Sequence, residues 1–332
     1  MNVIHVHLVK EYNMNVIFMG TPEFSVPILD EISKKHHISL VVTQPDAYNI
    51  KKKEYVFSPV KKWAIEHNVS LHQPERIKED YDIILKTPCD IIVTAAYGQI
   101  VPVEVLDYPR LKAINVHGSL LPKYRGGAPI QRAIINGDTK TGITIMYMAK
   151  KMDAGDILYQ EELPILDSDN QDTIFNKLSI LASTFINVVI DKLDKGLLKA
   201  VPQDETLVTF AYNLTKEDEH IDFSKSARDV FNQIRGLNSN PTGYFLLDNL
   251  NVKVYKSSIA ECEKMCYNKI LQNKPKSGTI VGINKDSFDV CCGDGSVISI
   301  LEIKLPGKNK MLVKDFINGQ GKKLLAIGKE LL

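Results

Sequence analysis

The sequence predicts an α/β protein in two parts: a doubly wound, mostly parallel sheet, followed by a small antiparallel β-barrel. The chain has 332 residues, which is more than one hydrophobic core usually spans. Short apolar runs alternate with helical patterns through the first half, as expected for β-α-β crossovers. Beyond residue 243 the pattern changes to short alternating runs divided by turn residues, which is typical of a small barrel.

The first apolar run, residues 16–19, ends at Gly20 and predicts a strand followed by a tight turn. We expect Thr21 to cap, and Pro22 to open, a helix that continues through Leu29. The fingerprint of a dinucleotide site does not follow this turn, so nicotinamide binding is not expected. Farther along we expect strands over residues 38–43, 91–95, 113–116, 142–148 and 157–165, a helix capped by Ser58 and opened by Pro59, and a long helix over residues 170–193.

The second half begins after a loosely patterned segment, residues 199–216, which we interpret as a linker. The expected parts are an N-terminal extension (1–13), a first domain (14–198), the linker (199–216) and a second domain (217–332). Because Met14 restarts the sequence with the same four residues as Met1, it is a candidate true start. In the second domain we expect a helix over residues 227–237 and strands over residues 244–247, 252–255, 278–283, 287–291 and 297–305.

Composition narrows the class of protein. The chain has 41 Lys and Arg against 40 Asp and Glu, so it lacks a strongly basic nucleic-acid tail, although the region after residue 205 is mildly basic. An odd number of cysteines without a secretory leader favours a reduced cytoplasm. Cys262, Cys266, Cys291 and Cys292 are poorly spaced for zinc, and no metal is expected. No apolar run is long enough for a membrane span, and we expect a monomer.

The stretch AINVHGSLLPKYRGGAP, residues 113–129, joins a strand, a polar pair and a glycine-rich turn. Side chains alternate along a strand, so Asn115 and His117 share one face. Gly126 and Gly127 allow backbone to approach a ligand closely. Ligands of open α/β sheets bind at the carboxyl ends of strands, and we therefore place the active site here.

An amide beside an imidazole suits acyl transfer to an amine. The imidazole of His117 can relay the proton of the attacking amine, and Asn115 can donate to the developing oxyanion. Asp153, in the turn KKMDAGDI (150–157), is the candidate carboxylate that orients the ring, and Asp156 is its rival. Taken alone, an Asn-x-His pair is more often structural than catalytic, and Asp-Ala-Gly-Asp is simply a turn.

A resemblance joins these motifs. NVHGSLLPKYRGGAPIQRAI (115–134), together with Asp153, resembles the signature of the 10-formyltetrahydrofolate-dependent formyltransferases. This family resemblance implies a Rossmann-like formyltransferase domain and an OB-like barrel that contacts tRNA. It extends from Met14 almost to the end and includes FMGTPEFSVPIL (18–29), VTQPD (42–46), SPVK (58–61), AAYGQIVP (95–102), TGITIMYM (141–148), QDETLVTFAYNLTKEDEHIDFS (203–224) and GDG (293–295).

The resemblance also implies roles for individual residues. Asn115, His117 and Asp153 would be catalytic, with 10-formyltetrahydrofolate as formyl donor and no metal. The second half is similar to that of members that formylate methionyl initiator tRNA. The alternatives are members with a small amine acceptor (glycinamide ribonucleotide or an amino-sugar) and a non-catalytic RNA-binding protein on the same scaffold. The implied folate contacts are Ser119, Leu120, Leu121, Pro122, Gln99 and Ile100, and the implied tRNA contacts are Lys51, Lys52, Lys53 and Arg125.

The loop AYNIKKKEYVF (47–57) departs from the bacterial family pattern, in which an arginine between glycines enters the end of the acceptor stem. Here Lys51 stands at the place of that arginine, and Ile50 and Lys52 replace the glycines. Glu54 occupies a usual lysine position. Most exposed lysine runs are only solvated, but these cations should attract phosphate without the planar geometry of arginine. We expect tRNA binding to persist and selectivity for the initiator to soften.

Overall fold

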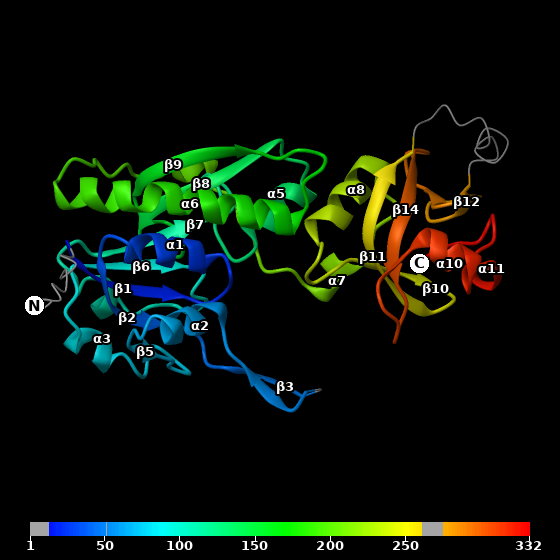
Figure 1. The fold of residues 1–332 in the computed structure, drawn as a ribbon. Helices are drawn as coiled ribbons and strands as arrows, with labels where there is room; N and C mark the ends of the chain where they lie inside the picture. Colours follow the sequence, from blue (N-terminus) through cyan, green and yellow to red (C-terminus); the bar gives the residue numbers. More distant parts are fainter. Residues whose placement is uncertain (1–12, 51, 261–274) are drawn as a thin grey trace, which may run out of the picture. The chain divides into compact units, whose positions relative to one another are not determined.

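The computed structural model describes residues 13–50, 52–260 and 275–332 (Figure 1). The expectations for residues 1–12, Lys51, Cys262 and Cys266 fall outside these residues. The chain forms two compact units, and neither is a single continuous stretch of sequence. The first unit contains the residues up to Arg125 with Gly142–Leu163 and Phe175–Thr209, and the second contains Gly126–Thr141, Pro164–Ile174 and Phe210–Leu332.

The first unit is built on a seven-stranded sheet with the order β5-β2-β1-β6-β7-β8-β9. The strands from β5 to β7 run parallel and β8 is antiparallel to β7, which confirms the predicted mostly parallel sheet. The register pairs Thr94 with Asn115, and His117 with Thr144. The strands are β1 (Asn15–Gly20), β2 (His37–Val42), β5 (Leu71–His72), β6 (Ile91–Ala95), β7 (Ala113–His117), β8 (Lys140–Tyr147) and β9 (Ile157–Pro164).

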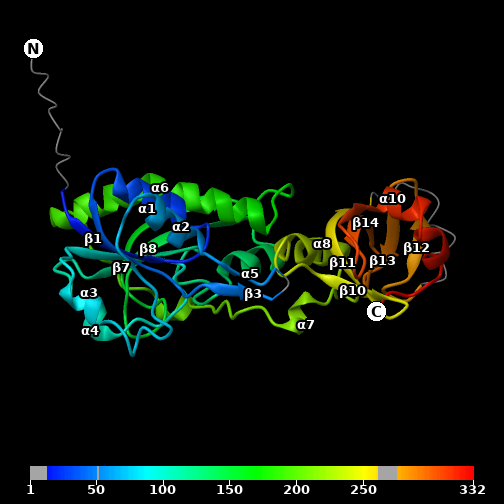
Figure 2. The ribbon, with the colours of Figure 1, turned by 60° about the horizontal axis from the view of Figure 1, so that its bottom comes forward.

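Helices cover both faces of this sheet. Figure 2 shows α1 (Ser25–Ser33), α2 (Pro59–Glu66) and α6 (Gln171–Asp194) on one side, and α3 (Asp82–Lys86) and α4 (Val103–Leu106) on the other. The expected cap of α2 is confirmed, because Ser58 Oγ accepts a hydrogen bond from the backbone N–H of Lys61 at 3.0 Å. The expected cap of α1 is wrong: the Thr21 hydroxyl donates to the carbonyl of Tyr97, and the helix begins later, at Ser25.

By length and composition alone, α6 could cross a bilayer, which the apolar pattern of the sequence did not suggest. Its apolar side instead belongs to the core of the fold, because Ile174, Leu178, Ile186 and Ile190 are completely buried. Two polar side chains of α6 also bind the backbone around α1: Ser179 Oγ donates to the carbonyl of Phe24, and Asn187 Nδ2 to that of Glu31. These contacts are those of a core helix.

In the second unit, α5 (Pro129–Ile135) packs against α8 (Ala227–Gly236). A side chain at Gly236 would lie 2.7 Å from that of Ile135, so glycine permits this close approach. α8 starts with a capping box, in which Ser226 Oγ accepts from the backbone N–H of Asp229. The remaining helices in the described residues of this unit are α7 (Lys216–Glu219), α10 (Val313–Asn318) and α11 (Gly321–Leu324).

The second sheet is antiparallel and has the order β10-β11-β14-β13-β12, with β15 beside β14. The C-terminal residues join its two edges, since Leu332 exchanges backbone hydrogen bonds with Leu246 of β10 while Glu330 bridges to Thr279 beside β12. The sheet therefore curls around its apolar core, as predicted for a small barrel. The strands are β10 (Tyr244–Leu247), β11 (Leu250–Ile259), β12 (Ile280–Ile283), β13 (Phe288–Cys291), β14 (Val297–Lys304) and β15 (Met311–Leu312).

Candidate active site

The imidazole of His117 is held at the carboxyl end of β7, and only 7% of its side chain is exposed. Its Nε2 lies 2.9 Å from the carbonyl oxygen of Tyr124. A carbonyl oxygen can only accept a hydrogen bond, so Nε2 carries the proton of this contact. The other ring nitrogen, Nδ1, is 3.8 Å from Oδ2 of Asp153, which is beyond hydrogen-bond distance. The ring is therefore oriented by a backbone carbonyl, and Nδ1 faces the carboxylate.

Of the two candidate carboxylates, Asp153 is the one beside His117. Asp156 lies near Tyr147 instead: its carbonyl accepts from the backbone N–H of Tyr147, and the pKa of the Tyr147 phenol is raised first by burial and then by the Asp156 charge. Asp153 has a backbone φ of +50°, in the left-handed region that few residues other than glycine adopt. The turn thus presents this carboxylate through an unusual backbone conformation.

Asn115 points its amide from the same face of β7. Its Oδ1 accepts a 2.7 Å hydrogen bond from the hydroxyl of Thr94, its register partner on β6. Thr94 is 2% exposed, so this contact fixes the amide orientation from inside the sheet. With the oxygen engaged, the two N–H groups of Asn115 Nδ2 remain as donors toward the end of the strand. Thr94 was not singled out from the sequence, because its role depends on the pairing of β6 with β7.

The segment predicted to contact folate, residues 119–122, follows β7, and hydrogen bonds from neighbouring side chains hold its backbone. The carbonyl of Ser119 and the backbone N–H of Leu121 both hydrogen bond the Thr144 hydroxyl, at 2.7 and 3.1 Å. Gln160 Nε2 donates to the carbonyl of Leu121 at 2.8 Å. At Gly142 a side chain would meet Leu120 at 2.5 Å, so β8 lies directly against the segment. These contacts hold its backbone in place for a ligand.

The other two predicted folate contacts lie after β6 and differ from each other. The Gln99 side chain is occupied within the protein: Oε1 accepts from the backbone N–H of Ile77, and Nε2 donates to Gln44 and Pro74. Ile100 has 61% of its surface exposed and can contact an apolar ring.

Comparisons with known proteins identify the family of the chain. Residues 13–190 match the formyl transferase family model, and residues 213–321 match the model of the formyl transferase C-terminal domain. The chain belongs to the formyltransferase family. Methionyl-tRNA formyltransferase of Staphylococcus aureus strain MW2 is 42% identical over 319 residues, covering 96% of this chain and 99% of the relative. The curated relative from strain JH1 has the same name, identity and coverage.

Solved structures of formyltransferases share the fold. The sugar 3N-formyl transferase WlaRD superposes with a TM-score of 0.63 at 18% identity, over 90% of this chain and all of that one. The N-formyltransferase from Helicobacter canadensis, with folinic acid and dTDP-3-aminofucose, gives 0.62 at 19% identity over 86% and 98%. HypX from Aquifex aeolicus with tetrahydrofolic acid gives 0.63 at 16% identity over 94% of this chain and 48% of that one.

The loop predicted to contact tRNA, residues 47–57, contains a hairpin of two strands, β3 (Ala47–Asn49) and β4 (Glu54–Val56). Lys52 is exposed, and its Nζ lies 3.6 Å from Glu54 Oε1. Lys53 occupies the left-handed backbone region with φ +54°. Tyr48 and Tyr55 pair across the hairpin with their ring centroids 5.1 Å apart, and both rings are largely exposed. The hairpin thus presents aromatic surface as well as charge.

Arg125 does not have the position expected of a tRNA contact, because it is only 1% exposed. Its guanidinium donates to Gln203 and Glu205. A guanidinium this deeply buried presents no exposed N–H to a phosphate, although its Nη1 has no hydrogen-bond partner among the described residues, so the sequence-based assignment of Arg125 needs correction. In the sequence, Arg125 is simply a cation beside two glycines. Its burial depends on residues 203–209, which are remote in sequence and pack against it in the fold.

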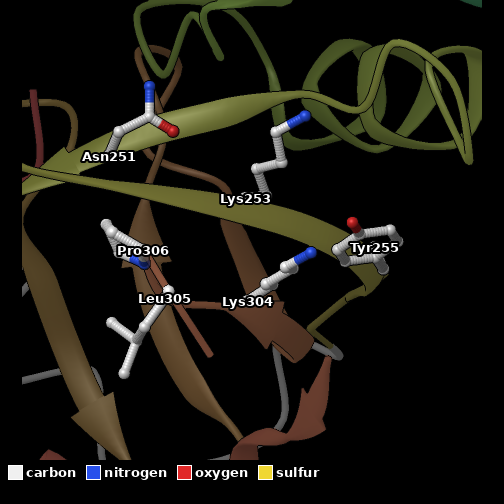
Figure 3. Close-up of a pocket in the computed structure, with 7 residues that line it drawn as sticks. Asn251, Lys253, Tyr255, Lys304, Leu305 and Pro306 are labelled. Carbon is white, nitrogen blue, oxygen red and sulfur yellow. The ribbon is translucent and has the colours of Figure 1, made fainter. Parts of the chain in front are cut away.

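The second unit carries a basic pocket that the sequence did not reveal. Figure 3 shows Lys253 of β11 and Lys304 of β14 lining it together with Tyr255, and the two lysines are register partners. Like charges directly opposite on paired strands repel, which favours an anion between them. Lys310 Nζ lies 5.2 Å from the Tyr255 ring, but its charge is paired with Glu302 Oε1 at 3.2 Å. The pocket lining consists of Asn251, Lys253, Tyr255, Lys304, Leu305, Pro306 and Gly307.

Proposed function

We propose that the protein transfers the formyl group of 10-formyltetrahydrofolate to the α-amino group of methionyl initiator tRNA. The observation that carries the proposal is the arrangement at the end of β7: an imidazole fixed through Nε2, a carboxylate facing its Nδ1, and an amide with its donors free. The acceptor is supported by the 42% identical methionyl-tRNA formyltransferase, which matches along 96% of the chain.

His117 is the proton relay of the reaction. Because the Tyr124 carbonyl occupies Nε2, Nδ1 is the nitrogen that takes the proton of the attacking amine. As the new C–N bond forms and the bond from the formyl carbon to the folate nitrogen breaks, His117 returns a proton to that departing nitrogen. The Asp153 carboxylate, 3.8 Å from Nδ1, stabilises the imidazolium that exists between these two transfers.

Asn115 stabilises the charge that develops on the formyl oxygen. Its Nδ2 donates to the oxyanion, and the Thr94 hydroxyl holds the amide so that little reorganisation is needed during the reaction. Loss of one such donor typically lowers the rate by ~10²–10³.

Residues 119–122, Gln99 and Ile100 are the proposed folate contacts. The backbone of the segment is already held by Thr144 and Gln160, and Ile100 offers an exposed apolar side chain to an aromatic ring. Folate supplies the activated formyl group. Ser119 and Gln99 use their side-chain polar atoms within the protein, so they would contact folate through their backbone.

The tRNA contacts are proposed at two separate surfaces, the β3–β4 hairpin with Lys51, Lys52 and Lys53 and the barrel pocket with Lys253 and Lys304. Lysines at both places supply positive charge for phosphates, and Tyr255 adds a flat ring. Such contacts position an RNA without reading its sequence. We also propose that the protein is a monomer, because one chain supplies every proposed catalytic group; light scattering would show a dimer if this is wrong. The proposal that it lies in the cytoplasm rests on its odd number of cysteines.

The test is incubation with a labelled formyl donor and a panel of acceptors. Charged initiator methionyl-tRNA should take up label, with charged elongator methionyl-tRNA a weaker acceptor. Label in glycinamide ribonucleotide or a dTDP-amino-sugar instead would move the acceptor to a small amine. Tight binding of tRNA without label in any acceptor would indicate a non-catalytic RNA-binding protein.

A further inference from the structure

Arg125 links, through hydrogen bonds, the residues that lie on the two sides of the His117 ring. Its Nε and Nη2 donate to Gln203 Oε1 at 3.0 and 2.8 Å, and Nη2 also donates to Glu205 Oε1 at 2.7 Å. Its backbone N–H and that of Tyr124 both donate to Thr209, at 2.9 Å each. The residues whose carbonyl orients His117 are therefore tied to the segment 203–209, which includes the short helix η1 (Glu205–Leu207).

The same segment holds the turn that carries Asp153. Gln203 Nε2 donates to the carbonyl oxygens of Asp153 and Gly155, at 2.9 and 2.8 Å. Glu205 Oε2 pairs with Lys151 at 3.0 Å, at the beginning of the turn. Both polar atoms of the Gln203 amide are therefore hydrogen bonded: the oxygen accepts from Arg125, and the nitrogen donates to the turn.

The turn requires such support. Asp153 has φ +50°, a conformation that persists for a residue with a side chain only where surrounding contacts hold it. A side chain at Gly155 would lie 1.8 Å from the carbonyl of Tyr147, so the turn is also pressed against β8. Small movements at Gln203 would therefore move the Asp153 carboxylate relative to His117.

We infer that Arg125 and Gln203 are positioning residues of the formyl transfer, which set the separation of the His117 ring from the Asp153 carboxylate. The inference rests on the proposed function for its kinetic part. It gives the segment 203–209 a role in the active site. Gln203 hydrogen bonds both the Arg125 guanidinium and the turn that faces Nδ1, and Arg125 directly follows Tyr124, whose carbonyl is bound to Nε2.

The test compares Gln203→Glu in two backgrounds. This substitution keeps an acceptor for Arg125 but removes both donors to the turn and places a carboxylate against its carbonyls. In the otherwise unchanged protein, kcat should fall ~10–10²-fold with little change in the KM for folate, the usual effect of misplacing a catalytic group. In an Asp153→Asn background the same substitution should lower kcat less than about 2-fold, because the carboxylate that it misplaces is already absent. Gln320→Glu, the same chemical change at an exposed position, is the matched control.

An equal loss in both backgrounds would overturn the inference and leave Gln203 a stabilising residue only. A second measurement does not depend on any acceptor: in ¹⁵N-histidine NMR spectra of the resting protein, Gln203→Glu should move the His117 Nδ1 resonance toward its position in Asp153→Asn. An unmoved resonance would also contradict the inference. A moved resonance in a protein that formylates no acceptor would leave the positioning intact while refuting the proposed function.

Discussion

The proposed catalytic role of His117 depends on the residues around it as well as on its own side chain. The side chain is placed by strand alternation, but its working nitrogen is chosen by the Tyr124 carbonyl on Nε2. The carboxylate expected to orient the ring faces the opposite nitrogen at 3.8 Å and is suited to stabilising charge instead. The orienting and the charge-stabilising groups are therefore different residues in this site.

Replacing either member of the pair on β7 should reduce turnover strongly. We expect His117→Ala and Asn115→Ala each to lower kcat by at least ~10², the scale for losing a general acid/base or an oxyanion donor. Folate affinity, measured by fluorescence or calorimetry, should change little because the residues proposed to hold the folate, Gln99, Ile100 and residues 119–122, are left unchanged. Near-normal turnover in both variants would place the chemistry elsewhere.

Thr94 offers a finer test of the amide orientation. Thr94→Val keeps the shape but removes the hydroxyl bound to Asn115 Oδ1, so the amide loses its fixed orientation. Steady-state kcat should fall about 5- to 10-fold, the rate equivalent of one ordinary hydrogen bond. Thr94→Ser, which keeps the hydroxyl, should retain most of the activity. Equal rates for the two variants would show that this hydrogen bond does not orient a catalytic amide.

At the level of elements, the β3–β4 hairpin is the part that departs most from the family pattern. Replacing Lys51, Lys52 and Lys53 by Ala should weaken tRNA binding and reduce the slope of log affinity against log salt by up to ~3, near one unit per lost phosphate contact. Ala at the exposed Lys78, Lys86 and Lys195 is the matched control and should leave the slope unchanged. If the hairpin variant also keeps the wild-type slope, the RNA contacts must be sought on the barrel.

The elements themselves were largely predictable, since both sheets, the long helix and the cap at Ser58 follow from local patterns of polarity and turn residues. The start of α1 was not, because Thr21 uses its hydroxyl on a distant carbonyl. The proposed catalytic pair, Asn115 and His117, was predicted from the alternation of side chains along one strand. The role of Thr94 depends on the register between β6 and β7. The role of Gln203 and the burial of Arg125 depend on contacts between segments that are remote in sequence, which no local pattern predicts.

At the scale of the whole molecule, the two compact units do not follow sequence order. Residues 126–141 and 164–174 group with the C-terminal part, where Arg132 pairs with both carboxylate oxygens of Asp218 and Arg235 donates to the carbonyl of Leu166. A cut within the predicted linker would therefore separate each of these segments from its partners. The proposed tRNA contacts are better tested by surface substitutions than by truncation.

Global stability should depend on His36. The side chain is completely buried, neither ring nitrogen has a hydrogen-bond partner among the described residues, and burial lowers the pKa of the imidazole. The unfolded chain therefore binds a proton at a higher pH than the folded one, so stability should decline as pH falls below about 6.5. Urea unfolding of His36→Leu between pH 7.5 and 5.5 should show a smaller decline than the wild-type protein. Parallel curves would contradict this source of acid sensitivity.

The most direct test of the account is a single-turnover reaction of excess protein with charged initiator methionyl-tRNA and 10-formyltetrahydrofolate, followed by mass spectrometry of the aminoacyl group. The wild-type protein should convert methionine to formylmethionine at its α-amino group, and His117→Ala should do so at least ~10² more slowly. A methionyl group that stays unformylated with the wild-type protein, or one formylated equally fast by His117→Ala, would contradict the assignment of this chemistry to the end of β7.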